Sequence, residues 1–287
     1  MINLHPDQPS MSEGQTLELI REVQAGMAGH VTPSLTELYF PNSQQPNVLD
    51  NGTGSFAEVD GTTLLVTNEH VINKKGLSHS FFGSEVFVSA ACQRYGLDKP
   101  CDVGAARVNP DAWANHGTEA RAIAFNRFAL KHDTVPYEIL WVAGYPGARV
   151  KQFDRLQLAV CEATPTQEYL FHDDVEPYEE FDPSVHFAVY YSPANAKQVF
   201  DGPSSSPGRS APHGLSGSLV WNTRRLECFY AGRSWNPDLA LVTGIVWGWP
   251  NSNYLIATKV EHFREFLRET ARLPDSRSKQ LNPAAPR

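Results

Sequence analysis

The chain has 287 residues, of which 41% are hydrophobic and 20% charged, and its formal net charge is −8. This is the composition of an ordinary globular protein rather than a disordered or fibrous one, and its 20 glycines and 21 prolines indicate many turns. The negative charge argues against nucleic acid or an anionic membrane as the main partner, since both require basic patches.

The N-terminus and the cysteines bear on the cellular compartment. No apolar run approaches the roughly 20 residues of a transmembrane helix, and the first residues, MINLHPD, lack the basic and apolar regions of a secretory signal. We therefore expect a cytoplasmic protein. The cysteines have no Cys-x-x-Cys spacing, so we expect reduced thiols and no metal or cofactor; they are Cys92, Cys101, Cys161 and Cys228.

The N-terminal segment, residues 1–30, contains an amphipathic pattern typical of a helix over 12–28. Its apolar stripe is Leu17, Ile20, Val23 and Met27. We expect this helix to pack on the outside of the domain. A role in partner docking or inhibition is the alternative.

From residue 31 the pattern changes to short strands separated by turns. The Asp60-Gly61 pair between two apolar runs predicts a hairpin. No helices alternate with these strands, so residues 31–125 are expected to form an antiparallel barrel or sandwich. The predicted strands are 35–40, 52–59, 62–67, 81–90 and 103–108.

A second run of short strands fills residues 126–273. Its predicted strands are 137–146, 156–163, 185–191, 218–222, 241–249 and 254–257. A final helix is predicted to begin at Thr258, which has capping-box spacing to Glu261, and to stop at Pro274. The tail, 274–287, is expected to be disordered. The acidic stretch 173–182 fits a solvated face, or else a site for a cation or a basic substrate.

One stretch, Pro212 to Val220, has the composition of a nucleophile loop. Ser216 stands in the sequence Gly-Leu-Ser-Gly-Ser, directly before an apolar strand. Glycines let the backbone turn tightly and bring amide N–H groups close to a reacting carbonyl. Taken alone, the stretch also fits a small-residue turn between strands.

Two further residues complete a candidate catalytic set. His70 ends the apolar run 64–72, where a rigid strand meets a loop, and Asp102 leads directly into a small-residue apolar strand. A buried carboxylate requires a partner, and an imidazole N–H is one. In isolation, His70 fits a structural histidine and Asp102 fits a turn cap.

Together these segments resemble the chymotrypsin-like (trypsin-like) serine peptidases, in particular their bacterial, HtrA-like branch. The order His, Asp, Ser also fits this family and not the α/β-hydrolases. No PDZ domain is visible after the final helix. The resemblance covers about residues 31–273 and rests on GTGSF at 52–56 with LVTNEHV at 65–71, DVGA at 102–105, GLSGS at 214–218, GIVWG at 244–248 and IATKV at 256–260.

The resemblance implies a mainly all-β fold of two antiparallel β-barrels, with an N-terminal and a C-terminal helix. It assigns His70 and Asp102 to the first barrel and Ser216 to the second. Ser216 would be the nucleophile, His70 the general base and Asp102 the residue that orients the imidazole. The backbone N–H groups of Gly214 and Ser216 would form the oxyanion hole.

The resemblance also implies a substrate pocket walled by Ser210, Trp247, Gly248, Trp249 and Leu255. The floor of this pocket falls near Ser210, where there is no carboxylate to bind lysine or arginine. We therefore expect cleavage after small or apolar residues.

One departure from the family concerns activation. Many animal relatives have an aspartate before the nucleophile, which pairs with a new N-terminus after zymogen cleavage. Leu215 occupies that position here and cannot accept an ammonium group. We expect no activation by that route, so that control would come from a regulatory partner, the N-terminal segment or oligomerisation.

The sequence thus predicts a serine endopeptidase that hydrolyses a protein or peptide substrate through an acyl-enzyme. The alternative is a latent or non-catalytic protein of the same fold that acts as a binding or regulatory module. An esterase that uses the same triad is a third hypothesis.

Overall fold

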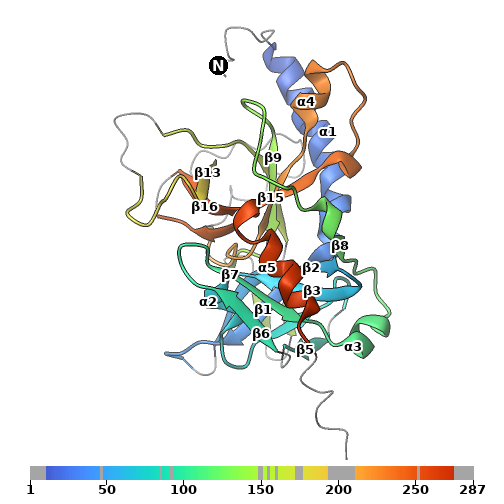
Figure 1. The fold of residues 1–287 in the computed structure, drawn as a ribbon, viewed down its shortest axis with the longest axis vertical. Coiled ribbons are helices and arrows are strands. Elements are labelled where there is room, and N and C mark those ends of the chain that lie inside the picture. The colour runs from blue at the N-terminus through green and yellow to red at the C-terminus, as the bar shows by residue number, and fades with distance from the viewer. Residues whose placement is uncertain are drawn as a thin grey trace, which may run out of the picture.

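The computed structural model describes residues 11–45, 48–84, 86–90, 93–147, 151–153, 156–158, 161–171, 177–192, 211–250 and 253–274. Two curled antiparallel sheets form half-barrels, one above the other (Figure 1), and the predicted chymotrypsin-like fold is confirmed. The predicted N-terminal and C-terminal helices are both present. Residues 275–287 of the predicted tail lie outside the described residues.

The first sheet has the strand order β5-β4-β1-β2-β3-β7-β6, with β8 beside β2. Its strands are β1 Leu35–Pro41, β2 Leu49–Val59, β3 Thr62–Thr67, β4 Ser78–Ser80, β5 Phe87–Ser89, β6 Arg94–Leu97, β7 Val103–Arg107 and β8 Ile123–Ala124. The predicted hairpin is confirmed, because Val59 pairs with Thr62 around Asp60 and Gly61. These two turn residues have φ values of 48° and 76°, as a type I′ turn requires.

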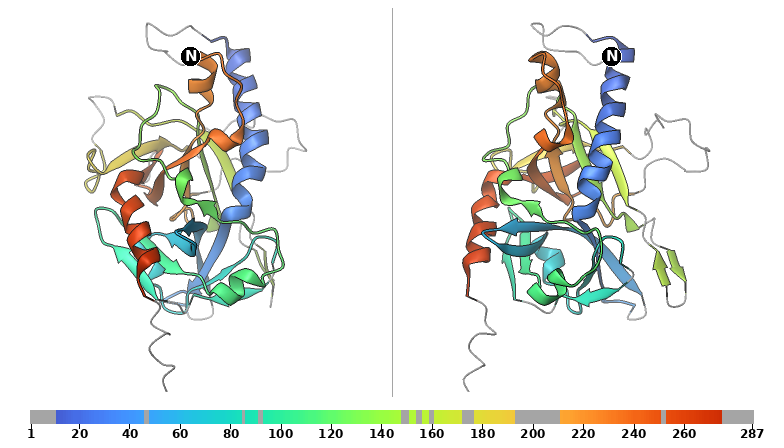
Figure 2. Two further views of the ribbon diagram at one scale, coloured as in Figure 1. Left: turned by 45° about the vertical axis from the view of Figure 1, so that its right-hand side comes forward. Right: turned by 90° about the vertical axis from the view of Figure 1, so that its right-hand side faces the viewer.

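The second sheet has the order β12-β9-β14-β15-β16-β13. Its strands are β9 Leu140–Gly144, β12 Glu162–Thr166, β13 His186–Tyr190, β14 Leu219–Asn222, β15 Leu241–Gly248 and β16 Tyr254–Lys259. A separate two-stranded sheet, β10 Lys151–Phe153 and β11 Leu156–Leu158, projects from the body (Figure 2).

The N-terminal helix α1, Glu13–Val31, begins at a capping box formed by Ser12 and Gln15. It buries Leu19, Val23, Met27 and Val31, which recur every four residues. Leu17 and Ile20 of the predicted stripe are both half-buried, but only Ile20 is among the described side chains that pack against the core, so the placement of Leu17 in the stripe is wrong. The helix runs along the second sheet (Figure 2) and contacts β12.

The C-terminal helix α5, Arg264–Arg272, packs on β2, β3 and β7 of the first sheet. Thus α1, which precedes the first sheet in the chain, covers the second sheet. In turn α5, which follows the second sheet in the chain, covers the first sheet. One apolar core joins α1, both sheets and α5, and it includes Met27, Val66, Trp141 and Leu267. The shorter helices are α2 Glu69–Ile72, α3 Pro110–Ala114 and α4 Arg225–Tyr230.

Three local predictions are wrong. The predicted strand 62–67 is confirmed, but the expectation that His70 ends a β run over 64–72 is wrong, because His70 lies on the one-turn helix α2. Thr258 does not cap the final helix: it lies in β16, which runs on to Lys259 because it pairs with β13 and β15. Of the single strand predicted over 81–90, only 87–89 form a described strand, β5, which pairs with β4.

Cys101, Cys161 and Cys228 are free thiols, while Cys92 lies outside the described residues. Burial raises the pKa of the Cys161 thiol to about 11. No helix in the described part of the chain is both long and apolar enough to cross a membrane.

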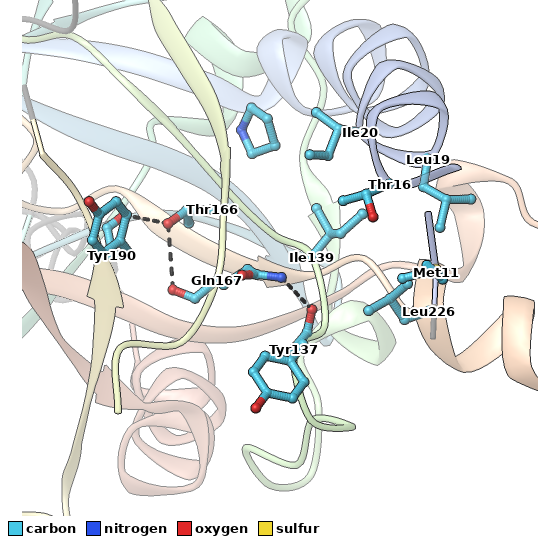
Figure 3. Close-up of a pocket in the computed structure, with 11 residues that line it drawn as sticks. Met11, Thr16, Leu19, Ile20, Tyr137, Ile139, Thr166, Gln167, Tyr190 and Leu226 are labelled. Carbon is cyan, nitrogen blue, oxygen red and sulfur yellow. Dashed lines mark hydrogen bonds between the residues drawn. The ribbon is translucent and has the colours of Figure 1, made fainter. Parts of the chain in front are cut away.

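A cavity of about 200 Å³ lies between α1 and one end of the second sheet (Figure 3). Most of its lining is apolar, and it includes Leu19 and Ile20 of α1 facing Ile139 and Leu226. None of the predicted catalytic residues lines it.

The register of α1 can be tested with two leucines, Leu17 and Leu19, which lie two positions apart in its first two turns. We expect Leu19→Ala to lower the free energy of unfolding by about 2 kcal/mol or more, because a 5% exposed side chain leaves the core. Leu17→Ala is the matched control and should cost less than about 1 kcal/mol. Urea unfolding measures both. Equal losses would contradict the register described for α1.

Candidate active site

His70 and Asp102 are brought together at the end of the first sheet. Asp102 Oδ2 lies 2.6 Å from His70 Nδ1, and Asp102 Oδ1 accepts a hydrogen bond of 3.1 Å from the His70 backbone N–H. The Asp102 side chain is 4% exposed and that of His70 is 45% exposed. Because a carboxylate only accepts hydrogen bonds, Nδ1 carries the proton and Nε2 is left as a base.

The backbone at Asp102 is held in an uncommon conformation. Its φ is +48°, in the left-handed region that aspartate tolerates better than most residues. The Asn68 side chain, at the start of α2, donates to the Asp102 carbonyl at 2.8 Å. Asp102 and α2 are thus tied together through both the side chain and the backbone of Asp102.

The second sheet fixes the turn that precedes Asp102. Thr258 Oγ1 donates to the Cys101 carbonyl at 2.7 Å, and His186 Nε2 lies 2.8 Å from the Pro100 carbonyl. The His186 ring donates here because its Nδ1 accepts from the Asp182 backbone N–H. Burial lowers the pKa of His186, which favours this neutral donor.

The loop that carries Ser216 lies directly before β14 and is folded by its own backbone hydrogen bonds. Leu215 N–H bonds to the Pro212 carbonyl and Ser218 N–H to the Leu215 carbonyl, both at 2.9 Å. Gly214 and Gly217 have φ values of +95° and +89°, so both positions favour glycine. A Cβ on Gly217 would also lie 2.0 Å from the Thr53 carbonyl.

The backbone amide groups of this loop differ in whether they are hydrogen-bonded. The N–H groups of Leu215, Gly217 and Ser218 are bonded, whereas those of Gly214 and Ser216 make no hydrogen bond to any residue within the described ranges. Ser216 is half-buried and Leu215 is buried. Two amides near the predicted nucleophile are therefore not occupied by any residue that the structure describes.

Thr53 of β2 ties this loop to the first sheet. Its backbone N–H donates to the Ser216 carbonyl at 3.0 Å, and its hydroxyl donates to the Gly214 carbonyl at 2.7 Å. The same hydroxyl accepts from the Tyr145 N–H at 2.9 Å, and the Thr53 carbonyl accepts from Thr67 Oγ1 at 2.7 Å.

Gly52, next to Thr53, marks where the two halves of the site meet. A Cβ at Gly52 would lie 3.2 Å from Val71, the neighbour of His70, and 3.8 Å from the Ser216 carbonyl. The helix that carries His70 and the loop that carries Ser216 thus approach the same residue of β2.

The predicted pocket residues take several positions. Trp247 is buried beside Tyr254 and Ile256, whereas Leu255 is buried in a different cluster with Leu215. The Trp249 ring lies edge-on to the His213 ring at 5.5 Å. Gly248 is half-buried at the end of β15, and Ser210 lies outside the described residues.

A charged pair adjoins this region. The ammonium group of Lys99 lies 5.8 Å from the centre of the Trp247 ring and pairs with Glu180 at 2.6 Å. Glu180 belongs to the predicted acidic stretch, of which residues 173–176 lie outside the described residues. Over the described ranges, no group of three or more histidine, cysteine, aspartate or glutamate side chains is arranged to hold a metal ion.

Sequence analysis did not single out Thr53, Asn68, His186 or Thr258 as residues of the site. The first two lie inside the quoted motifs GTGSF and LVTNEHV, where a hydroxyl and an amide among small or apolar residues are a local signal. His186 and Thr258 act across the two sheets. Thr258 lies inside the quoted motif IATKV, whereas no local pattern marks His186.

Comparison with known proteins supports the fold. Granzyme C matches with a TM-score of 0.50 and 12% identity, over 84% of this chain and 95% of its own. The active form of the Rv3671c protease from M. tuberculosis matches with a TM-score of 0.50 and 14% identity, over 94% and 96%. No protein-family model and no curated protein matches the sequence. The chain has the fold of the chymotrypsin-like serine proteases.

Thr53 offers a test of the contact between sheet and loop that does not depend on activity. Thr53→Val keeps the shape of the side chain but removes the hydroxyl that joins Tyr145 to Gly214. We expect a loss of about 1–3 kcal/mol in the free energy of unfolding, because two backbone groups lose their partner. Thr53→Ser retains the hydroxyl and should lose less. Equal stability of the two variants in urea unfolding would contradict the role described for this hydroxyl.

Proposed function

We propose that this protein is a serine endopeptidase and that His70, Asp102 and Ser216 form its catalytic triad. The observation that carries the proposal is the 2.6 Å contact between Asp102 and His70 Nδ1. This contact leaves Nε2 free as a base on the helix that meets the Ser216 loop at Gly52. A buried carboxylate that orients a half-exposed imidazole is the arrangement such a base needs.

In the proposed reaction, Ser216 Oγ attacks the peptide carbonyl and His70 Nε2 accepts the hydroxyl proton. The same proton then passes to the leaving amine, and water hydrolyses the acyl-enzyme in a second round of the same proton transfers. Asp102 keeps the proton on Nδ1 and stabilises the imidazolium. No cofactor takes part.

The unbonded amides of Gly214 and Ser216 support the proposed oxyanion hole. Neither bonds to a residue that the structure describes, while the neighbouring amides are bonded within the loop or to β15. Fixed donors of this kind cost no reorganisation when charge develops on the substrate oxygen. A single such donor is worth on the order of 10²–10³ in rate.

The proposed pocket takes small or apolar side chains. Trp249, Gly248 and the loop before Ser216 would form its walls, and Trp249 lies against His213 of that loop. Leu215 is 3% exposed within an apolar cluster, in keeping with a loop that is not ordered by a new N-terminal ammonium group.

The triad can be tested with a fluorophosphonate probe, which labels an activated serine. Ser216→Ala and His70→Ala should abolish labelling and peptide hydrolysis while the circular dichroism spectrum stays that of the wild type. Asp102→Asn should lower kcat by about 10⁴, because an amide favours the wrong imidazole tautomer. Full peptidase activity of Ser216→Ala would refute the assignment. A wild-type chain that binds proteins but is never labelled would favour the latent or non-catalytic alternative.

The specificity can be tested by profiling a peptide library with the wild-type enzyme and Ser216→Ala. We expect cleavage after small or apolar residues, since the proposed pocket floor near Ser210 offers no carboxylate. Strict cleavage after arginine or lysine would contradict this pocket. Turnover of esters without turnover of any peptide would favour the esterase.

A further inference from the structure

A buried polar patch lies on the face of the first sheet that meets the nucleophile loop. Glu37 and Tyr39 of β1 stand opposite Thr53 and Asn51 of β2 in the antiparallel register. Side chains of directly opposed residues project on the same face of a sheet. The four side chains therefore form one two-by-two group.

The β2 half of this patch holds the backbone around the proposed oxyanion hole. Thr53 bonds to Gly214, Ser216 and Tyr145, as described above. Asn51 Nδ2 donates to the Tyr145 carbonyl at 2.6 Å, and a Cβ on Gly214 would lie 2.7 Å from the same Nδ2. A shift of the Glu37 or Tyr39 side chain would displace Thr53 or Asn51 beside it. That displacement would disturb the hydrogen bonds to the loop.

Glu37 is the unusual member of the patch. It is 6% exposed, and its Oε1 has no hydrogen-bond partner of normal geometry among the described residues. Burial raises the pKa of the Glu37 carboxyl to about 7, and the neighbouring Tyr39 hydroxyl offsets part of this shift. The carboxyl thus changes its charge near neutral pH.

The other titratable groups around Glu37 stay uncharged across this range. Burial raises the pKa of Tyr39 and also that of Tyr145, which follows β9. Cys161, beside Tyr145, has its pKa raised to about 11 by burial. His79 of β4 pairs with Leu38 and so faces the opposite side of the sheet; burial lowers its pKa to about 4. No cation forms an ion pair with Glu37 in the part of the chain that the structure describes.

We propose that Glu37 is a positioning residue for the nucleophile loop: as a neutral acid it permits the ordered loop, and as a carboxylate it disorders the loop. This role rests on the proposed peptidase function. An unpaired charge at a buried site is costly. Ionised Glu37 lowers its free energy by moving toward water, where its charge is hydrated. This movement displaces its neighbours Thr53 and Tyr39. The ordered loop binds the proton more tightly, so it is favoured at low pH and lost as the pH rises through about 7.

The test compares the wild type with Glu37→Gln, which is nearly isosteric with the neutral acid, at pH 6 and pH 8. Glu58→Gln is the matched control, because Glu58 is an exposed carboxylate of the same sheet. With a pKa of about 7, roughly 10% of Glu37 is ionised at pH 6 and roughly 90% at pH 8. Fluorophosphonate labelling of Ser216 in Glu37→Gln, relative to the wild type, should therefore rise by up to about tenfold between pH 6 and pH 8. Glu58→Gln should follow the wild type.

Hydrogen–deuterium exchange over residues 212–220, in the Ser216→Ala background, gives a readout that needs no activity. The Glu37→Gln loop should exchange more slowly than the wild-type loop at pH 8, and the difference between the two should be smaller at pH 6. A labelling ratio or an exchange difference that does not change with pH would overturn the role of Glu37. So would a Glu37→Gln chain that fails to fold at pH 6. If no chain is labelled but the pH-dependent exchange difference appears, the peptidase function is wrong while the control of the loop by Glu37 stands.

Discussion

Hydrogen bonds exchanged between the two sheets are the constraint on which the candidate site depends. Thr53 of the first sheet holds the loop that carries Ser216. In return, Thr258 and His186 of the second sheet hold the turn before Asp102. Each sheet thus positions a candidate catalytic residue that belongs to the other. Because catalytic geometry tolerates errors of only about 0.5 Å, neither half-barrel could assemble this site alone.

The two terminal helices also join one sheet to the other, through apolar packing rather than single hydrogen bonds. The helix α1 precedes the first sheet but packs on the second, and α5 follows the second sheet but packs on the first. One apolar core therefore runs through all four parts. Separating the half-barrels would expose this core as well as break the hydrogen bonds between the sheets. The large apolar core fixes how the two half-barrels are placed relative to each other. The few hydrogen bonds between the sheets then fix the loop that carries Ser216 and the turn before Asp102.

The parts of the structure that the sequence predicted are those set by neighbouring residues. The Asp60-Gly61 hairpin and the place of Asp102 just before a buried strand follow from local chemistry. The features that the sequence did not predict depend on contacts between residues far apart in the chain. Thr258 and Glu261 have capping-box spacing, yet the ladder with β13 and β15 keeps Thr258 in a strand. Thr53, and Glu37 in its proposed role, act on a loop more than 160 positions away. The hydroxyl inside GTGSF is a local signal at Thr53, but it does not identify that loop as its partner.

The position of the buried carboxylate distinguishes this chain from those peptidases of similar fold that have an aspartate in front of the nucleophile. An aspartate on the loop itself needs a cation as its partner, and Leu215 removes that need by making this position apolar. Glu37 lies instead on the first sheet, directly opposite Thr53 on the neighbouring strand, and its partner would be a proton. A proton is a weaker and more readily reversed partner than a buried ammonium group, because its occupancy follows the pH of the solution. Order in the loop would then depend on its surroundings without cleavage of the chain.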